Sequence, residues 1–159
     1  MKDRFFQNIH VVNALPALSI ADDFFDVGTS AITDIVNLSN YDRATFIMQL
    51  GAGATGTGTI TIESCDDVSA STATAITFDA WKSTTSDVWS DRTSQASFAT
   101  TAGAGATYAF EVNASELSGT DKFVRLKALE LVNGAVTGNI ICILSNARYM
   151  HEVKQTAIV

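Results

Sequence analysis

The sequence predicts an all-β protein, an antiparallel β-sandwich or jelly roll with an irregular N-terminal arm. Segments in which apolar and polar residues alternate recur about every ten residues, which is typical of folds built from many short strands. Glycines cluster between these segments, at 51–58 and 103–105. A helical pattern is confined to residues 113–117, so strands dominate the expected fold.

The length and composition indicate one folded domain. The chain has 159 residues, of which 47% are hydrophobic and 17% charged, and this balance excludes an intrinsically disordered chain. No stretch approaches the roughly 20 apolar residues that a membrane-spanning helix needs. We expect an N-terminal arm at 1–30, the sandwich at 31–150 and a C-terminal tail at 151–159.

In the first two thirds of the sandwich, alternation predicts which residues face the core. Successive side chains of a strand point to opposite faces, so every second residue shares a face. Less regular strands are expected near 9–13, 31–38 and 73–82. The residues expected to face inward are Phe46, Met48 and Leu50 in 45–50, Ile60, Ile62 and Ser64 in 57–65, and Tyr108, Phe110 and Val112 in 106–112.

The last two strands differ in pattern. The segment 123–131 alternates most clearly and places Arg125, Lys127 and Glu130 outward. The segment 136–144 is a nearly continuous apolar run rich in isoleucine. Such a run is typical of a strand that is buried on both faces, or of one that lies at a subunit contact.

The helical segment 113–117 predicts a single turn. Asn113 or Ser115 is suited to cap its first residues, because their short polar side chains bond to free backbone amides. Gly119 is expected to end the turn.

The net charge argues against nucleic acid as a partner. Seventeen acidic and ten basic residues give a net charge of −7, whereas phosphate binding needs clustered cations. The nearest basic group is Lys122, Arg125 and Lys127, which alternation divides between two strand faces. Residues 1–80 hold ten acidic and three basic residues, which suits a locally basic partner or simply aids solubility.

The two cysteines, Cys65 and Cys142, are expected to be free and buried, although pairing stays open. The N-terminus does not match a signal peptide, because Gln7, Asn8 and His10 interrupt the apolar segment. We therefore expect synthesis and folding in a cytoplasm.

No pattern predicts an enzyme, a cofactor or a metal site. The two histidines, His10 and His151, lie near opposite ends of the chain, and no G-x-S-x-G nucleophile motif occurs. The glycine-rich segment 51–58 lacks the Lys-Ser/Thr ending of a phosphate loop. Two groups of carboxylates, 22–26 and 66–67, are better explained as turn residues than as an acid–base pair or a calcium site.

Two irregular regions are the expected contact surfaces. Phenylalanine pairs in the arm need a cover, and either fold back onto this domain or dock onto a neighbour. The long polar stretch 84–105 is expected to be functional or partly strand-forming. The candidate partner-interface residues are Phe5, Phe6, Phe24, Phe25, Trp89 and Phe98. Deletion of 1–12 is expected to leave a folded domain that no longer binds its partner.

Surface aromatic residues leave a carbohydrate-binding module open as an alternative function. Trp81, Trp89, Tyr41 and Tyr108 could stack against sugar rings. Tyr108 is expected in the core, however, and aromatic residues at strand spacing more often belong to a core or an interface.

Three stretches of the chain carry a resemblance to a known family. They are residues 36–46 (VNLSNYDRATF) with 59–67 (TITIESCDD), 108–117 (YAFEVNASEL) with 122–127 (KFVRLK), and 138–144 (GNIICIL) with 147–149 (ARY). In this order they resemble small structural proteins of tailed-bacteriophage virions that decorate or cement the capsid shell, and the resemblance covers about residues 31–150.

This resemblance implies a non-enzymatic β-sandwich or jelly roll, often a homotrimer, that binds where subunits of the major capsid protein meet. The expected partners are therefore the major capsid protein and further copies of the chain, and the expected location is the capsid surface of a virion. A tail or head-fibre component of the virion is the alternative.

Overall fold

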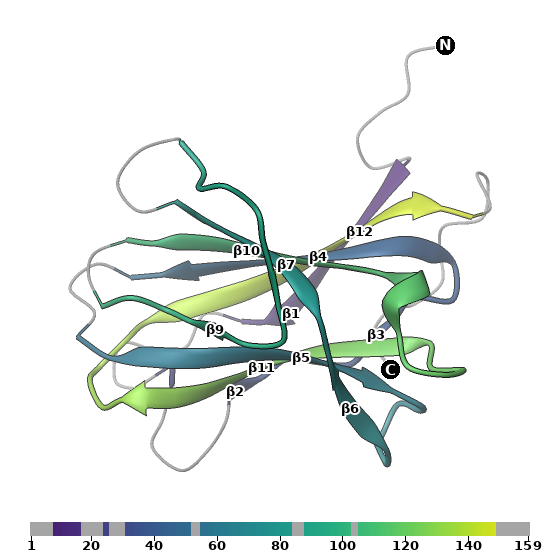
Figure 1. Cartoon of the computed structure of the whole chain (residues 1–159), viewed down its shortest axis with the longest axis horizontal. Helices are drawn as coiled ribbons and strands as arrows, with labels where there is room; N and C mark the ends of the chain where they lie inside the picture. The colour runs from purple at the N-terminus through teal and green to yellow at the C-terminus, as the bar shows by residue number, and fades with distance from the viewer. Residues whose placement is uncertain are drawn as a thin grey trace.

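The computed structural model describes residues 8–16, 24–25, 31–51, 55–83, 88–102 and 105–148. In this part of the chain, two antiparallel sheets pack face to face, so the predicted all-β sandwich is confirmed. Figure 1 shows β4, β10 and β12 in the upper layer and β5 and β11 in the lower layer. The jelly roll, a finer description of the same architecture, stays a prediction.

Sheet A, the larger layer, joins strands from both ends of the chain. Its central strand β4 pairs with β12 on one side and with β10 on the other. The order across the sheet is β1 (Ile9–Leu15), β12 (Gly138–Ala147), β4 (Tyr41–Leu50), β10 (Thr107–Asn113), β7 (Phe78–Ser83) and β8 (Thr93–Gln95).

Sheet B covers the inner face of sheet A. Its centre is the long pair of β11 (Phe123–Val132) and β5 (Thr57–Cys65). The shorter strands at its margins are β2 (Ala31–Ile32) and β3 (Val36–Asn37) on β11, and β6 (Ala73–Ile76) and β9 (Phe98–Ala99) on β5.

The inward residues that alternation predicts are buried. All nine have 3% exposure or less, and the outward Arg125 and Lys127 are half-buried. Glu130 was also expected outward, but it lies opposite the buried Gly58 and its Oε1 is buried. On β12 only every second residue is buried, namely Gly138, Ile140, Cys142 and Leu144. The run at 136–144 is therefore not buried on both faces within the described chain, and its outer isoleucines stay half-buried.

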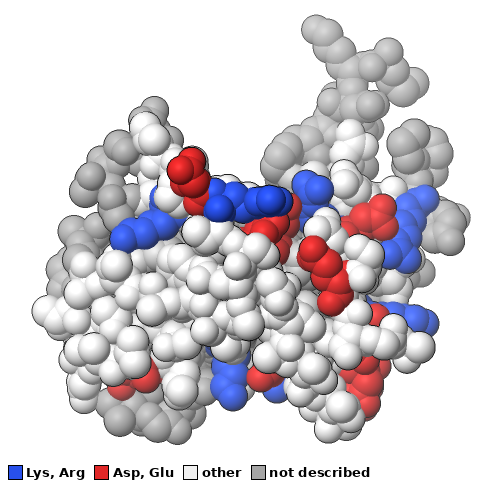
Figure 2. Space-filling model, viewed as in Figure 1, with Lys and Arg blue, Asp and Glu red and all other residues white. Residues whose placement is uncertain are grey.

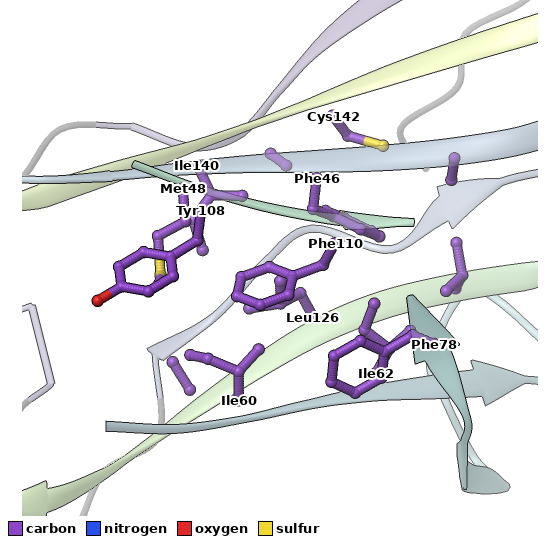
Figure 3. Packing of buried hydrophobic residues seen from close by; sticks show 14 of the residues in the cluster. Phe46, Met48, Ile60, Ile62, Phe78, Tyr108, Phe110, Leu126, Ile140 and Cys142 are labelled. Carbon is purple, nitrogen blue, oxygen red and sulfur yellow. The ribbon is translucent and has the colours of Figure 1, made fainter. Parts of the chain in front are cut away.

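Aromatic rings from β10 fill the centre of the core. In Figure 3, Tyr108 and Phe110 point from sheet A toward Ile60, Ile62 and Leu126 of sheet B. The rings of Phe78 and Phe110 meet edge to face at 5.7 Å, a favourable arrangement for aromatic pairs. These fully buried side chains fix the spacing of the two sheets.

Part of the expected N-terminal arm belongs to the sandwich. The strand predicted near 9–13 is β1, which pairs with β12 and buries Val12. A deletion of 1–12 would therefore also remove residues 9–12 of this edge strand, and our expectation that the variant keeps a folded domain stays a prediction. The segments 1–7 and 149–159 lie outside the described residues.

The remaining local predictions hold with changes of detail. Residues 113–117 contain a 3-10 helix, η1 (Ala114–Glu116), where the Asn113 amide donates to Glu116 Oε2 at 2.7 Å. Gly119 follows in the left-handed region at φ 55°. The segment near 73–82 forms two strands, β6 and β7. The described parts of 84–105 contain β8 and β9, as a partly strand-forming stretch requires.

Candidate interaction surfaces

Phe24 and Phe25 fold back onto the sandwich. Their exposed fractions are 1% and 0%, and the Phe24 amide donates to the carbonyl of Val136 at 2.7 Å. The Phe25 ring lies against Gly58, where an added Cβ would approach ring carbons to 2.6 Å. We expected these phenylalanines at a partner interface, but the structure corrects this because they are core residues of their own chain. Phe5 and Phe6 lie outside the described residues.

Phe98 is also largely a packing residue. Its ring lies 5.5 Å from the rings of both Tyr108 and Phe110, and it is only partly exposed on β9. Phe98 therefore closes the margin of the core, and its role at a partner interface stays a prediction.

Trp89 differs from the other candidates because it lies on the surface. It is 43% exposed, and its neighbour Val88 is 70% exposed. The following residue anchors the loop, since the Ser90 amide donates to the Lys82 carbonyl at 2.9 Å and Ser90 Oγ accepts from the Lys82 amide. We call residues 88–89 the loop pair. These two residues present an exposed apolar surface on the connection between β7 and β8.

The outer face of sheet A, the side turned away from sheet B, carries a row of apolar residues that our sequence analysis missed as a site. Strand register places Ile141 beside Ile47, Ile47 beside Ala109, and Ala109 beside Trp81. Val11 and Ile143 form an adjacent apolar pair, and the register then continues to the polar Thr45. The sequence did carry an indication of this row. Ile47 and Ile141 are apolar residues at positions that alternation assigns to the outer face of their strands.

The charges on the outer face of sheet A are paired with one another. Arg43 Nε lies 3.4 Å from Glu111 Oε1, and Arg92 Nη1 lies 3.3 Å from Asp79 Oδ2. Thr45 Oγ1 also donates to Glu111 at 3.0 Å. Figure 2 shows such a mixture of acidic and basic residues along the upper margin of the molecule. The face therefore presents no net charge from these groups.

A second apolar area lies on sheet B at the end of β11. Leu129, Leu131 and Val132 are 47–59% exposed, and Ile32 lies diagonally across from Leu129 on β2. An irregular register between Glu130 and Val132 places Leu131 and Val132 together toward solvent. We call these four residues the β11 patch. Lys127 lies next to it, and the described residues offer this lysine no ion-pair partner.

A cavity of about 460 Å³ opens at the end of the sandwich beside η1. Leu38 and Leu117 line it, together with Asp121, Lys122 and Arg148. Asp121 accepts a hydrogen bond from Ser64 Oγ at 2.7 Å, and Arg148 Nε donates to Asp42 at 2.7 Å. The described lining residues include no histidine, cysteine or second carboxylate, so this arrangement offers no acid–base pair.

The carboxylates of the β5–β6 turn stabilise that turn. Asp67 Oδ1 accepts from the amides of Ser69 and Ser71, and Oδ2 accepts from Ser71 Oγ. The backbone and side-chain hydrogen bonds from Ser71 lower the pKa of Asp67, with smaller contributions from Ser69 and Ala70. Asp66 accepts from the Thr72 amide. The predicted turn role is confirmed here, and the three aspartates of the second group, Asp22, Asp23 and Asp26, lie outside the described residues.

No metal-binding group of three or more His, Cys, Asp or Glu side chains occurs in the parts of the chain that the structure describes. His10 lies on β1 with its ring centroid 6.3 Å from that of Tyr41, and His151 is outside the described residues. Tyr41 and Tyr108 are buried, so Trp81 and Trp89 are the remaining surface candidates for sugar stacking.

Both cysteines are free and buried, as predicted. Cys65 lies on β5 and Cys142 on β12, in different sheets. Burial raises the pKa of each thiol, because the low-polarity surroundings disfavour the thiolate. We therefore expect both thiols to be unreactive in the folded chain.

Comparison with protein-family models, curated proteins and solved structures returned no match to this chain. No helix among the described residues is long and apolar enough to cross a membrane.

Proposed function

We propose that this chain is a non-enzymatic structural protein of a tailed-bacteriophage virion, which binds the outer capsid shell and stabilises it. The major capsid protein would be its partner, further copies of the chain would assemble with it, and it would be made in the host cytoplasm. The three motif stretches named above support this proposal through their resemblance to decoration and cement proteins.

The single observation that carries a contact role is the loop pair. Val88 is the most exposed large apolar residue in the described chain, and an exposed tryptophan follows it. Tryptophan is enriched at the energetic centres of protein interfaces, because its large ring buries much area at a small entropic cost. We therefore assign the loop pair to the shell contact, together with Phe5 and Phe6 as candidate residues of the N-terminal segment.

A modest contact at each copy is sufficient on a repeating shell. When several copies assemble and each seats on the lattice, the second and later contacts form at a high effective concentration. A substitution that removes one apolar anchor acts on every copy of the assembly at once. The loss of binding free energy is therefore repeated at each contact, so retention on the shell falls more than the affinity of one contact does. For this reason shell retention is a sensitive assay.

The test uses purified shells and the full-length chain. Each lost apolar anchor is expected to cost about 1.5–3 kcal/mol, which is about a 10- to 100-fold weaker single contact. Val88→Asp with Trp89→Ala should therefore abolish co-sedimentation with the shells. Val68→Asp is the matched control, since Val68 is exposed on a different turn. Equal retention of the Val88/Trp89 variant and the wild type would remove the loop pair from the contact.

Two other functions make different predictions in the same preparations. A tail or head-fibre subunit would form rings or tubes by itself, and electron microscopy of the purified protein would reveal them. A carbohydrate-binding module would change its tryptophan fluorescence with a glycan panel, because Trp81 and Trp89 are at the surface. Failure to bind shells, combined with either result, would replace the proposed function.

A further inference from the structure

We propose that the outer face of sheet A is the surface through which copies of this chain contact one another. The inference rests on the proposed function in one respect, because it names the surface for the self-assembly included there. Its occupant is a second copy of the chain.

A continuous apolar row crosses this face. Ile141, Ile47, Ala109 and Trp81 lie on four neighbouring strands in direct register. At a strand spacing of about 4.8 Å, this row crosses about 14 Å of the sheet. Val11, which is 38% exposed, and Ile143 widen the row at the β1 side. Ile47, Ile141, Ile143 and Trp81 are half-buried in the isolated chain, so a covering surface would remove further apolar area from water.

The charges on this face favour a second copy over a basic partner. The chain carries a net charge of −7, so two copies repel each other wherever acidic groups are unpaired. On this face Arg43 pairs with Glu111, and Arg92 pairs with Asp79. Two copies can therefore approach here without bringing unpaired acidic groups together, whereas a basic partner would gain little from a face that is already neutralised.

The contrast with sheet B supports this choice. The β11 patch has a similar apolar character, but Lys127 next to it has no ion-pair partner among the described residues. An unpaired lysine favours an acidic partner and disfavours direct contact with the same lysine of another copy. The β11 patch is therefore the less suitable of the two faces for contact between identical copies.

Ala109 lies in the row between Ile47 and Trp81, so a small side chain separates two large ones. Two sheets that pack face to face interdigitate their side chains at a distance of about 10 Å. The space above Ala109 can therefore receive a large side chain of the facing copy. The flanking residues Asn139, Gln49 and Thr107 are neutral and provide a polar rim.

The test measures self-association without shells, so its failure is distinct from failure of shell binding. Sedimentation velocity of the full chain should show a mass above 16.9 kDa that rises with concentration. Ile47→Thr and Ile141→Thr keep β-branched residues in the strands and should each weaken association about tenfold or more. Leu131→Thr in the β11 patch is the matched control and should associate as the wild type does.

A cysteine variant gives a second readout that does not depend on weakened packing. Gln49 is exposed on the outer face of sheet A, and both native thiols are buried. Gln49→Cys should form a covalent dimer with a short bis-maleimide, whereas Leu131→Cys should stay monomeric. The inference is overturned if the wild type remains at 16.9 kDa, if both threonine variants associate normally, or if Gln49→Cys cross-links no better than Leu131→Cys. A monomer that still binds shells would remove this inference and the self-assembly in the proposed function, and it would leave the shell contact in place.

Discussion

The packing of Phe25 over Gly58 can be tested by a pair of substitutions, and the test decides whether residues 24–25 belong to the core. In Gly58→Ala, the new Cβ would lie 2.6 Å from Cδ1 and Cε1 of the Phe25 ring. Ordinary contacts between carbon atoms are about 3.5–4.0 Å, so the ring or the strand must move. Overpacking of this kind costs about 1–3 kcal/mol of unfolding free energy.

The second substitution, Phe25→Ala, removes a fully buried ring and is expected to cost about 3–5 kcal/mol. If the two costs were independent, the double variant would lose about 4–8 kcal/mol. Because Phe25→Ala removes the obstacle itself, we expect the double variant to lose only about 3–5 kcal/mol. The predicted coupling is therefore about 1–3 kcal/mol.

Urea unfolding followed by circular dichroism measures these free energies. Gly105→Ala is the control, because a Cβ at Gly105 meets no atom within 4 Å and its cost arises from a backbone φ of +60°. Gly105→Ala and Phe25→Ala should therefore be additive. Additive costs for Gly58→Ala and Phe25→Ala as well would refute the packing of this ring over the β5 backbone.

Two further predictions concern the cysteines and the β5–β6 turn. Cys65 and Cys142 should not react with a thiol reagent at neutral pH in the folded protein, because burial raises both pKa values. Both should react quantitatively in urea. Rapid labelling without urea would contradict their burial. The carboxyl of Asp67 has a lower pKa in the folded chain than its value of 3.8 in the unfolded chain, so the ionised form stabilises the fold. This stabilisation is complete at a pH above 3.8 and is lost as the pH falls through the pKa of the folded chain. The difference in Tm between the wild type and Asp67→Asn should therefore shrink below about pH 4, and a difference that stays constant to pH 2 would exclude this contribution.

The sequence predicted the fold well where one face of a strand is polar. In 45–50, 57–65 and 106–112, alternation identified the buried side chains, because each of these strands has one face in the core. The same rule identified the outward position of Arg125 on β11. Its guanidinium pairs at 2.7 Å with Glu63 on the neighbouring strand β5. These predictions depend only on local periodicity.

The sequence could not predict contacts that depend on tertiary structure. Phe24 and Phe25 have no periodic context, so nothing local distinguishes folding back from docking on a partner. The short strands β8 and β9 lie in a polar stretch without a clear alternation, and their pairing with β7 and β5 specifies them. For the same reason the packing of Phe98 on Tyr108 could not be read from the sequence.

The apolar run of β12 links the fold to the proposed assembly. Its inner residues Ile140 and Leu144 are fully buried against sheet B, but Ile141 and Ile143 face outward. A strand needs only one apolar face to build a sandwich, so the outer isoleucines add nothing to the core. If nothing covers these isoleucines, the outer face of sheet A favours unspecific association with other sheets. Natural sheets usually prevent such association with exposed charges. Here the nearby charges are paired with each other, so they do not supply that protection. The outer isoleucines are thus best explained by a specific cover, and a second copy with the same neutral face provides one.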